Sequence, residues 1–227
     1  MRVVHILDHS IPRATPYARH TMYMLASQRA LGWETFQLTG PNHGGGTVTE
    51  EMIDGWLFYR TPRPGGILEG IPGVSALEYI GEIAYRIERL ARRVRPHILH
   101  VHSPALNAVP ALHVGRRVGI PVVYGVRAPD GDTGGLPHAP ALPRGVTRSM
   151  EMWVLKRAHA VTAESEALRN DILARGISPA KVTVIVCDIA STRESDTAQH
   201  VGGSATLGGE PHGLSYCRLY EHLMEAM

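Results

Sequence analysis

The segment at residues 95–124 constrains the fold most, because it contains a complete strand–helix–strand unit. Residues 98–101 (ILHV) form a short apolar run typical of a buried strand, and residues 107–118 repeat apolar side chains at helical spacing. Gly119 ends that helix before a second apolar run at residues 122–124. Such crossovers are right-handed and join parallel strands. The chain is therefore expected to contain a parallel sheet covered by helices.

The same alternation continues on both sides of this unit. Strand-type runs are found at residues 3–7, 34–38, 56–60, 160–163 and 182–186, and helical patterns at residues 18–31, 75–94, 150–157 and 165–175. This order predicts an α/β fold, a Rossmann-like doubly wound parallel sheet, as one domain over residues 1–186. Residues 187–227 are expected to form an irregular C-terminal tail, because residues 192–213 are polar and Gly-rich. Helical spacing returns at residues 214–227.

Composition narrows the class of protein. A hydrophobic share of 44% with 19% charged residues is ordinary for a globular protein of 227 residues. The net charge of +2 is too small to indicate a nucleic-acid partner. Cys187 and Cys217 lack the spacing of a metal or redox motif, which favours a reducing compartment. The first strand follows Met1 and Arg2 directly, and no run reaches the ~18 apolar residues of a membrane span, so we expect a cytoplasmic protein.

His102 and Ser103 follow the first strand of the central unit at its carboxyl end. Ligands of open parallel sheets bind beyond these strand ends, so we interpret the pair as orienting a hydroxyl group of a ligand. The alternative is a histidine that only closes the turn after the strand.

Three closely spaced histidines raise the question of zinc. Because strand residues alternate between faces, His100 and His102 share one face and His97 lies on the other. No third ligand converges on them in the sequence, so we expect no metal site. Asp130-Gly131-Asp132 resembles a metal-binding DxD pattern, but its Pro and Gly neighbours favour a turn.

Two further features have a functional and a structural interpretation. Arg127 can pair with a phosphate or carboxylate through its forked donors, or it can be a surface loop residue. The helix at residues 75–94 carries arginines beside its apolar stripe, which favours a solvated helix face over a lipid-binding one. These arginines are Arg86, Arg89, Arg92 and Arg93. The Gly run at residues 44–46 lacks the context of a phosphate loop and is expected to be a flexible turn.

Four long blocks of sequence carry a resemblance to a known family. They are VVHILDHSIP, QRALGWETFQLTGPNH, RPHILHVHSPALNAVPALHVGRRVGIPVVYGVRA and LRNDILARGISPAKVTVI. Together they resemble the amino-terminal half of glycosyltransferase family 4, and look closest to its exosortase-associated exopolysaccharide branch. The resemblance covers residues 1–185.

The resemblance implies two Rossmann-like lobes in the GT-B arrangement. The first lobe mostly binds the acceptor, and the second binds the nucleotide sugar. The reaction that the resemblance implies retains the anomeric configuration and needs no metal. It implies a nucleotide sugar and a sugar or lipid-linked acceptor as partners, peripheral contact with the inner face of the membrane, and no cofactor. Neither the resemblance nor the residues assign a catalytic residue. Carried over position by position, it implies substrate contacts at His9, Ser10, Thr15, His102, Ser103, Asn107, Arg127 and Ser165.

This sequence also departs from the family pattern. Pro16 stands where the family has a small residue and Gly, and it offers no backbone N–H to a donor phosphate. The acidic residues of a donor lobe have no counterpart within the 227 residues. We therefore expect a glycosyltransferase-like protein, truncated and weakly active or inactive alone. The alternative is a non-catalytic binding module or remnant that pairs with a separate donor-domain chain.

Overall fold

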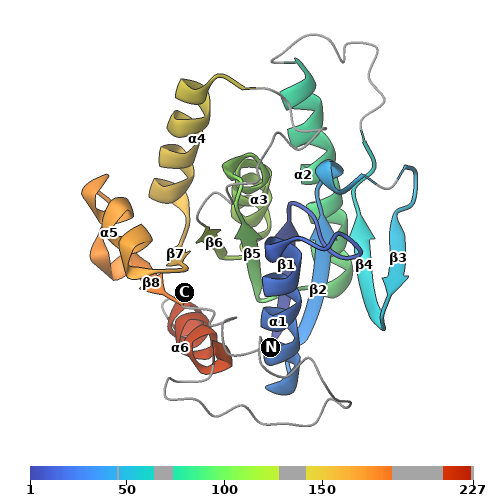
Figure 1. The fold of residues 1–227 in the computed structure, drawn as a ribbon, viewed down its shortest axis with the longest axis horizontal. Helices are drawn as coiled ribbons and strands as arrows, with labels where there is room; N and C mark the ends of the chain where they lie inside the picture. The colour runs from blue at the N-terminus through green and yellow to red at the C-terminus, as the bar shows by residue number, and fades with distance from the viewer. Residues whose placement is uncertain (45, 64–73, 128–141, 186–211, 226–227) are drawn as a thin grey trace.

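The computed structural model describes residues 1–44, 46–63, 74–127, 142–185 and 212–225 (Figure 1). Its strands are β1 (Arg2–Leu7), β2 (Glu34–Thr39), β3 (Glu50–Ile53), β4 (Trp56–Arg60), β5 (Ile98–His102), β6 (Val122–Val126), β7 (Ala160–Ala163) and β8 (Val182–Val184). They form one sheet in the order β3-β4-β2-β1-β5-β6-β7-β8. All neighbouring pairs are parallel except β3 and β4. The predicted α/β doubly wound fold is confirmed.

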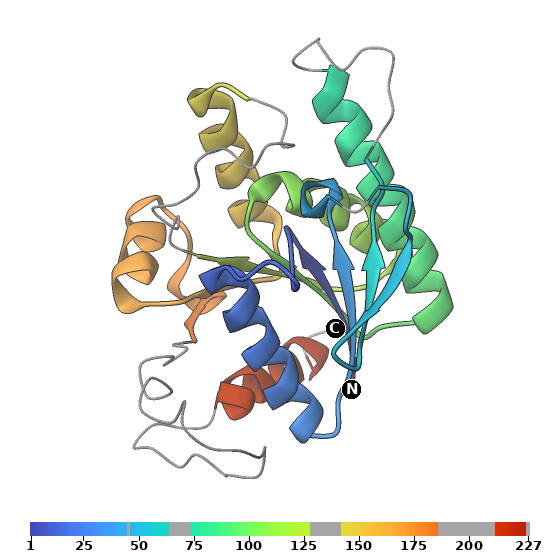
Figure 2. The same ribbon diagram turned by 45° about the vertical axis from the view of Figure 1, so that its right-hand side comes forward.

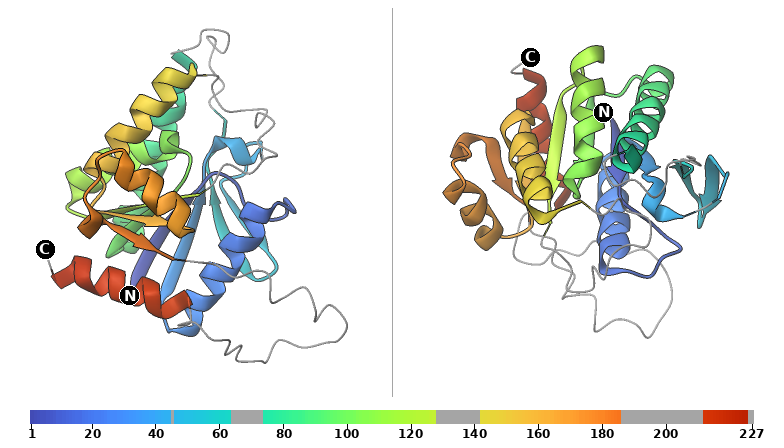
Figure 3. Two further views of the ribbon diagram at one scale, coloured as in Figure 1. Left: turned by 60° about the vertical axis from the view of Figure 1, so that its left-hand side comes forward. Right: turned by 90° about the horizontal axis from the view of Figure 1, so that it is seen from above.

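Helices cover both faces of this sheet. They are α1 (Pro16–Ala30), α2 (Val74–Val94), α3 (Ala105–Val118), α4 (Arg144–Arg157), α5 (Glu166–Ala174) and α6 (His212–Glu225), with short 3-10 turns η1 (Pro41–His43) and η2 (Pro179–Lys181). Helices α2, α3 and α4 lie side by side on one face, as the view from above in Figure 3 shows. Helix α6 lies beside the lower half of α1 (Figure 2) and packs with it on the opposite face. Helix α5 contacts β7 and β8 at the end of the sheet.

The alternation of side chains along β1 explains the two layers. Val4 and Ile6 point into the core under α2 and α3, whereas Val3 packs with residues of α1 and α6. All three are fully buried. A parallel sheet covered on both faces requires such near-continuous apolar strands, which is the pattern read from the sequence.

The antiparallel edge strand β3 was missed by sequence reasoning. It joins β4 through Asp54 and Gly55, whose φ angles of 49° and 77° are those of a tight hairpin turn. An Asp-Gly pair between apolar residues is a strong hairpin signal, so the feature was present in the sequence. The helix expected at residues 150–157 is longer, because α4 already begins at Arg144. The helix expected within residues 214–227 is confirmed as α6.

Gly115 on α3 allows the helix to approach the start of β6 closely. A Cβ atom added there would lie 2.5 Å from Cγ2 of Val122 and 2.8 Å from the carbonyl oxygen of Ile120. We expect Gly115→Ala to lower the free energy of unfolding by about 1–3 kcal/mol, because the backbone must shift. Gly81→Ala on α2 is the matched control, since nothing lies within 4 Å of its added Cβ. Urea unfolding of both variants checks this, and equal effects would contradict it.

Candidate substrate-binding site

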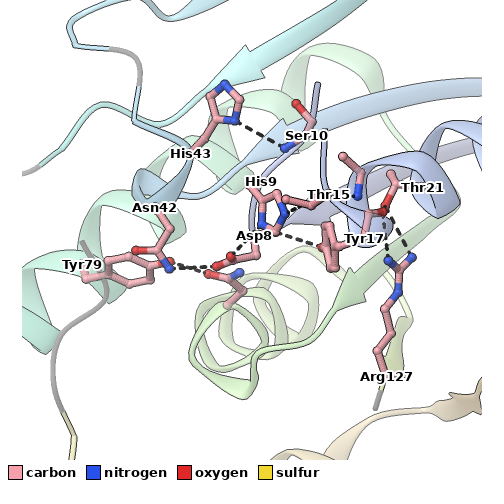
Figure 4. A network of polar contacts seen from close by, with 12 residues as sticks. Asp8, His9, Ser10, Thr15, Tyr17, Thr21, Asn42, His43, Tyr79 and Arg127 are labelled. Atoms are coloured by element: carbon pink, nitrogen blue, oxygen red, sulfur yellow. Dashed lines mark hydrogen bonds and ion pairs between the residues drawn. The ribbon is translucent and has the colours of Figure 1, made fainter. Parts of the chain in front are cut away.

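The strand order reverses between β1 and β5, which places the topological switch point at their carboxyl ends. The segments that leave β1, β2, β5 and β6 at this edge carry most of the residues singled out from the sequence. Figure 4 shows how their side chains point toward one another.

A chain of hydrogen bonds runs from Asp8 through His9 to Thr15. Asp8 Oδ2 lies 3.1 Å from His9 Nδ1, and His9 Nε2 lies 2.7 Å from the Thr15 hydroxyl (Figure 4). A carboxylate only accepts, so Nδ1 of His9 carries its proton and Nε2 accepts from the hydroxyl. The Thr15 oxygen also accepts the N–H of Ala18 at 3.0 Å and so caps α1. These hydrogen bonds therefore orient the lone pair of His9 Nε2 toward the Thr15 hydroxyl group.

Asn42 of η1 contacts the same carboxylate, and a separate polar pair joins Tyr79 of α2 to Asn107 of α3. Asn42 donates to Asp8 Oδ1 at 2.8 Å, and the Tyr79 hydroxyl donates to Asn107 Oδ1 at 2.9 Å. All four side chains are buried. Burial raises the pKa of Tyr79 well above its usual value, so the phenol stays protonated. The Asn42 Oδ1 and Asn107 Nδ2 atoms have no hydrogen-bond partner among the residues that the structure describes.

Ser10 is held by a buried arginine that sequence reasoning missed. Nη1 of Arg60 donates to the Ser10 hydroxyl at 2.6 Å, and Nη2 donates to the carbonyl oxygen of Ile11 at 3.1 Å. The Ser10 N–H donates to Nδ1 of His43 at 3.3 Å. Burial, with the nearby Arg60 charge, lowers the pKa of His43 to about 3, so its ring is a neutral acceptor. These contacts fix the loop after β1.

Arg127 follows β6 and is not a surface loop residue. Its side chain is 8% exposed, stacks 4.3 Å above the Tyr17 ring and pairs with Glu164 at 3.1 Å. Nη1 also donates to the Tyr17 carbonyl oxygen at 3.2 Å, and the backbone N–H donates to the Ser103 hydroxyl at 3.3 Å. The Tyr17 hydroxyl accepts the N–H of Asp8 at 3.0 Å. Tyr17 therefore joins the Arg127 contacts to the backbone of Asp8.

His102 turns inward from the edge and is 1% exposed. Nε2 of His102 lies 3.2 Å from Nδ1 of His5, and Nδ1 lies 3.5 Å from Nη2 of Arg127. His100, on the same face of β5, contacts both rings at centroid distances of 4.2 and 5.3 Å. His97 takes no part, because its Nδ1 accepts the backbone N–H of Arg2 at 2.9 Å. The third histidine of this cluster comes from β1, which sequence spacing alone did not reveal.

The structure separates the sequence-derived candidates into groups. His9 and Thr15 belong to the hydrogen-bonded chain from Asp8, Ser10 contacts Arg60 and His43, and Asn107 contacts Tyr79. His102 and Ser103 both contact Arg127. Ser165 takes no part in these contacts, since its exposed side chain caps α5 by accepting the N–H of Leu168 at 3.2 Å. The residues that sequence reasoning missed are Tyr17, Asn42, His43, Arg60 and Tyr79.

The arginines of α2 are held by contacts with neighbouring acidic side chains and backbone carbonyl oxygens. Arg92 and Arg93 pair with Glu88 and Glu50, and Arg86 donates to backbone carbonyl oxygens of Thr49 and Arg60. These contacts support the solvated-face interpretation of α2. Asp130-Gly131-Asp132 lies outside the described residues. Among the helices of the described ranges, none is both long enough and apolar enough to cross a membrane.

Comparison with known proteins agrees with this architecture. A family model described as "Glycosyl transferase 4-like domain" matches residues 17–188. The chain belongs to this family. The match spans β2 to β8 and includes Asn42, His102 and Arg127, whereas His9 and Thr15 precede it.

A curated relative gives the same assignment at the level of sequence. The GDP-mannose-dependent alpha-mannosyltransferase of Mycobacterium tuberculosis (strain CDC 1551 / Oshkosh) is 25% identical over 180 residues, which cover 78% of this chain and 45% of the relative. This glycosyl transferase 4-like chain thus spans about half the length of that enzyme.

Solved structures share the fold. A sucrose-phosphate synthase chain from Thermosynechococcus elongatus has a TM-score of 0.60 and 13% identity, with coverage of 98% of this chain and 99% of that one. Another structure of that enzyme also has a TM-score of 0.60, at 14% identity, but the match covers 82% of this chain and 48% of the other. UDP-GlcNAc 2-epimerase from Neisseria meningitidis, bound to UDP-GlcNAc, has a TM-score of 0.51 and 14% identity, covering 82% and 46%. The glycosyl transferase 4-like chain thus has the fold of one GT-B lobe.

Proposed function

We propose that these residues form the acceptor-side lobe of a retaining GT-B glycosyltransferase that transfers a sugar from a nucleotide sugar to a polysaccharide or lipid-linked acceptor. The family assignment and the mannosyltransferase relative support the class of reaction. The exopolysaccharide branch, the location in the cytoplasm and peripheral contact with the inner face of the membrane follow from the sequence resemblance and belong to the same proposal.

One observation carries the acceptor assignment. Asn42 and Asn107, both fully buried at the carboxyl edge, leave an acceptor atom and a donor atom without partners in the described part of the chain. An unsatisfied buried polar atom costs about 1–3 kcal/mol, so such a pair favours a ligand group that both donates and accepts. A sugar hydroxyl does both. It would lie beside the Asp8–His9–Thr15 chain.

The role that we assign to this lobe is to position the acceptor hydroxyl group. The network around Asp8 would hold an acceptor hydroxyl in one orientation, which lowers the entropic cost of bringing it to the anomeric carbon. A second lobe would supply the nucleotide sugar and the groups that stabilise the leaving phosphate. Alone, the 227 residues are expected to show little or no transfer. Pairing with a separate donor-domain chain is the alternative route to a complete cleft.

Calorimetric titration with nucleotide sugars and with lipid-linked saccharides tests this proposal. We expect the saccharide to bind and the nucleotide sugars to bind weakly or not at all. Asn107→Ala should weaken saccharide binding about tenfold, because it removes the free amide group. His113→Gln, at an exposed position on the same helix α3, is the control and should leave saccharide binding unchanged. Tight nucleotide-sugar binding without saccharide binding, or an Asn107→Ala variant with unchanged affinity, would overturn the proposal.

A further inference from the structure

His5, His100 and His102 converge on the face of the sheet that α1 and α6 cover. His5 and His100 are register partners on β1 and β5, and His102 follows two residues later on the same face. One ring nitrogen from each lies within 4.8 Å of the others. All three side chains are buried to 1% exposure or less. The sheet therefore assembles three imidazoles that are far apart in sequence.

We propose that these three histidines form a structural site for one divalent transition-metal ion of the zinc type. Imidazole nitrogen is a preferred ligand of such ions, and three histidine ligands are enough to hold zinc. Neutral rings are the form that binds, because a protonated ring has no free lone pair. The site lies next to the acceptor network but uses none of the side chains of Asp8, His9, Thr15, Asn42 and Asn107, and its role would be to join β1, β5 and α6.

The first argument for a bound ligand is a buried ring nitrogen of His100 that lacks a hydrogen-bond partner among the described residues. Nε2 of the fully buried His100 has no hydrogen-bond partner among the described residues. Its Nδ1 lies 2.6 Å from the Tyr220 hydroxyl of α6, which can accept the ring proton. With Nδ1–H satisfied in this way, Nε2 presents a lone pair. A metal ion would use this lone pair.

The partners of His5 show the same arrangement. Nε2 of His5 lies 2.8 Å from Oε1 of Gln28, a fully buried acceptor on α1, so Nδ1 presents the lone pair. Metal-binding histidines usually donate their other ring N–H to an oxygen acceptor, which orients the ring. Gln28 and Tyr220 supply this outer support for two of the three ligands.

The distances allow coordination after a small adjustment. Nδ1 of His5 and Nε2 of His102 are 3.2 Å apart, close to the edge of about 3.3 Å between ligands at zinc–nitrogen distances of 2.0–2.1 Å. The widest separation in the triad must shorten by at most about 1.5 Å, which small rotations of the rings can provide.

Without metal, the proton of His102 bridges these two nitrogens. Nε2–H of His102 then donates to His5, and Nδ1 of His102 accepts from Arg127 at 3.5 Å. With metal, the proton moves to Nδ1 and Arg127 gives up this weak contact. Arg127 keeps its ion pair with Glu164, which offsets its charge near the site. The bound and free forms therefore differ in one proton position on His102.

Metal analysis of the full chain tests the proposal. Protein without a polyhistidine tag is purified from cells grown with added zinc or cobalt, and its metal content is measured by mass spectrometry. We expect about one ion per chain and, with cobalt, the visible absorption of a low-coordinate nitrogen site. His100→Leu should lose the metal, and the exposed His113→Gln on α3 should keep it.

A second variant keeps the test decisive if His100→Leu does not fold. Tyr220→Phe removes the acceptor of the His100 ring proton and should weaken metal binding about 10- to 100-fold. A chelator should also lower the melting temperature of the wild type more than that of Tyr220→Phe. Wild-type protein with no bound ion after supplementation, or a folded His100→Leu that keeps the ion, would overturn the proposal.

Discussion

Acidification from about pH 7 to about pH 4.5 is expected to lower the free energy of unfolding by several kcal/mol. Burial lowers the pKa of His5 to about 4 and holds those of His100 and His102 well below the usual 6.5. The unfolded chain takes up protons near pH 6.5, whereas the folded chain does not, so stability is full above that pH and falls below it. His5 alone contributes roughly 3 kcal/mol at about 1.4 kcal/mol per pKa unit.

Urea unfolding across this pH range, with a chelator present, measures the effect without competition from metal ions. His5→Gln should reduce the pH dependence by about one proton between about pH 6 and about pH 4.5, because one buried titrating ring is gone. His113→Gln, at an exposed position, should leave the slope unchanged. Unfolding free energies that stay constant between these pH values would show that the cluster is not held neutral by the fold.

Tyr220→Ala is expected to cost about 3–5 kcal/mol of unfolding free energy, a large part of a typical total of about 5–15 kcal/mol. Tyr220 is fully buried between α6 and the sheet, where it packs with Val3, Ile98 and Val123. Its ring also stacks 5.3 Å from Trp33, and its hydroxyl contacts His100. Truncation leaves a cavity and removes the partner of a buried ring nitrogen.

Two controls separate the parts of this effect. Tyr220→Phe removes only the hydroxyl and should cost about 1–2 kcal/mol. Met224→Ala lies on the same helix at 37% exposure and should change stability by less than about 0.5 kcal/mol. Chemical denaturation of the three variants checks the ranking. If Tyr220→Ala were no more destabilised than Met224→Ala, α6 would not be anchored on the sheet.

Some of the residues of the candidate site could be predicted from the sequence. His9, Ser10, Thr15 and Asn107 follow strands or begin helices, and parallel topology predicts that such positions share one edge. Arg60 is the last residue of β4, and a charged side chain at the end of an apolar strand is expected to face solvent, yet it is buried. Its role depends on the Ser10 loop passing over it, a contact between residues 50 positions apart.

The histidine cluster also shows that sequence spacing predicts which residues of one strand share a face, but not which strands are neighbours. The two-residue period of β5 placed His100 and His102 on one face, and that prediction agrees with the contact between their rings. His5 could not be added, because its alignment with His100 depends on β1 and β5 being neighbours in the sheet. Strand order follows from the packing of all the helices and strands together.

By itself the sequence determined most of the strands and helices and the parallel pairing of the strands it identified, because periodicity, Gly and Pro act within a few residues. It missed the antiparallel edge strand β3 and the first part of α4. Only the tertiary structure decided which side chains meet: Asp8 with Asn42, His5 with His102, and His100 with Tyr220. These contacts join residues 34, 97 and 120 positions apart. Strand order, register and the docking of α6 set them, and no local pattern contains that information.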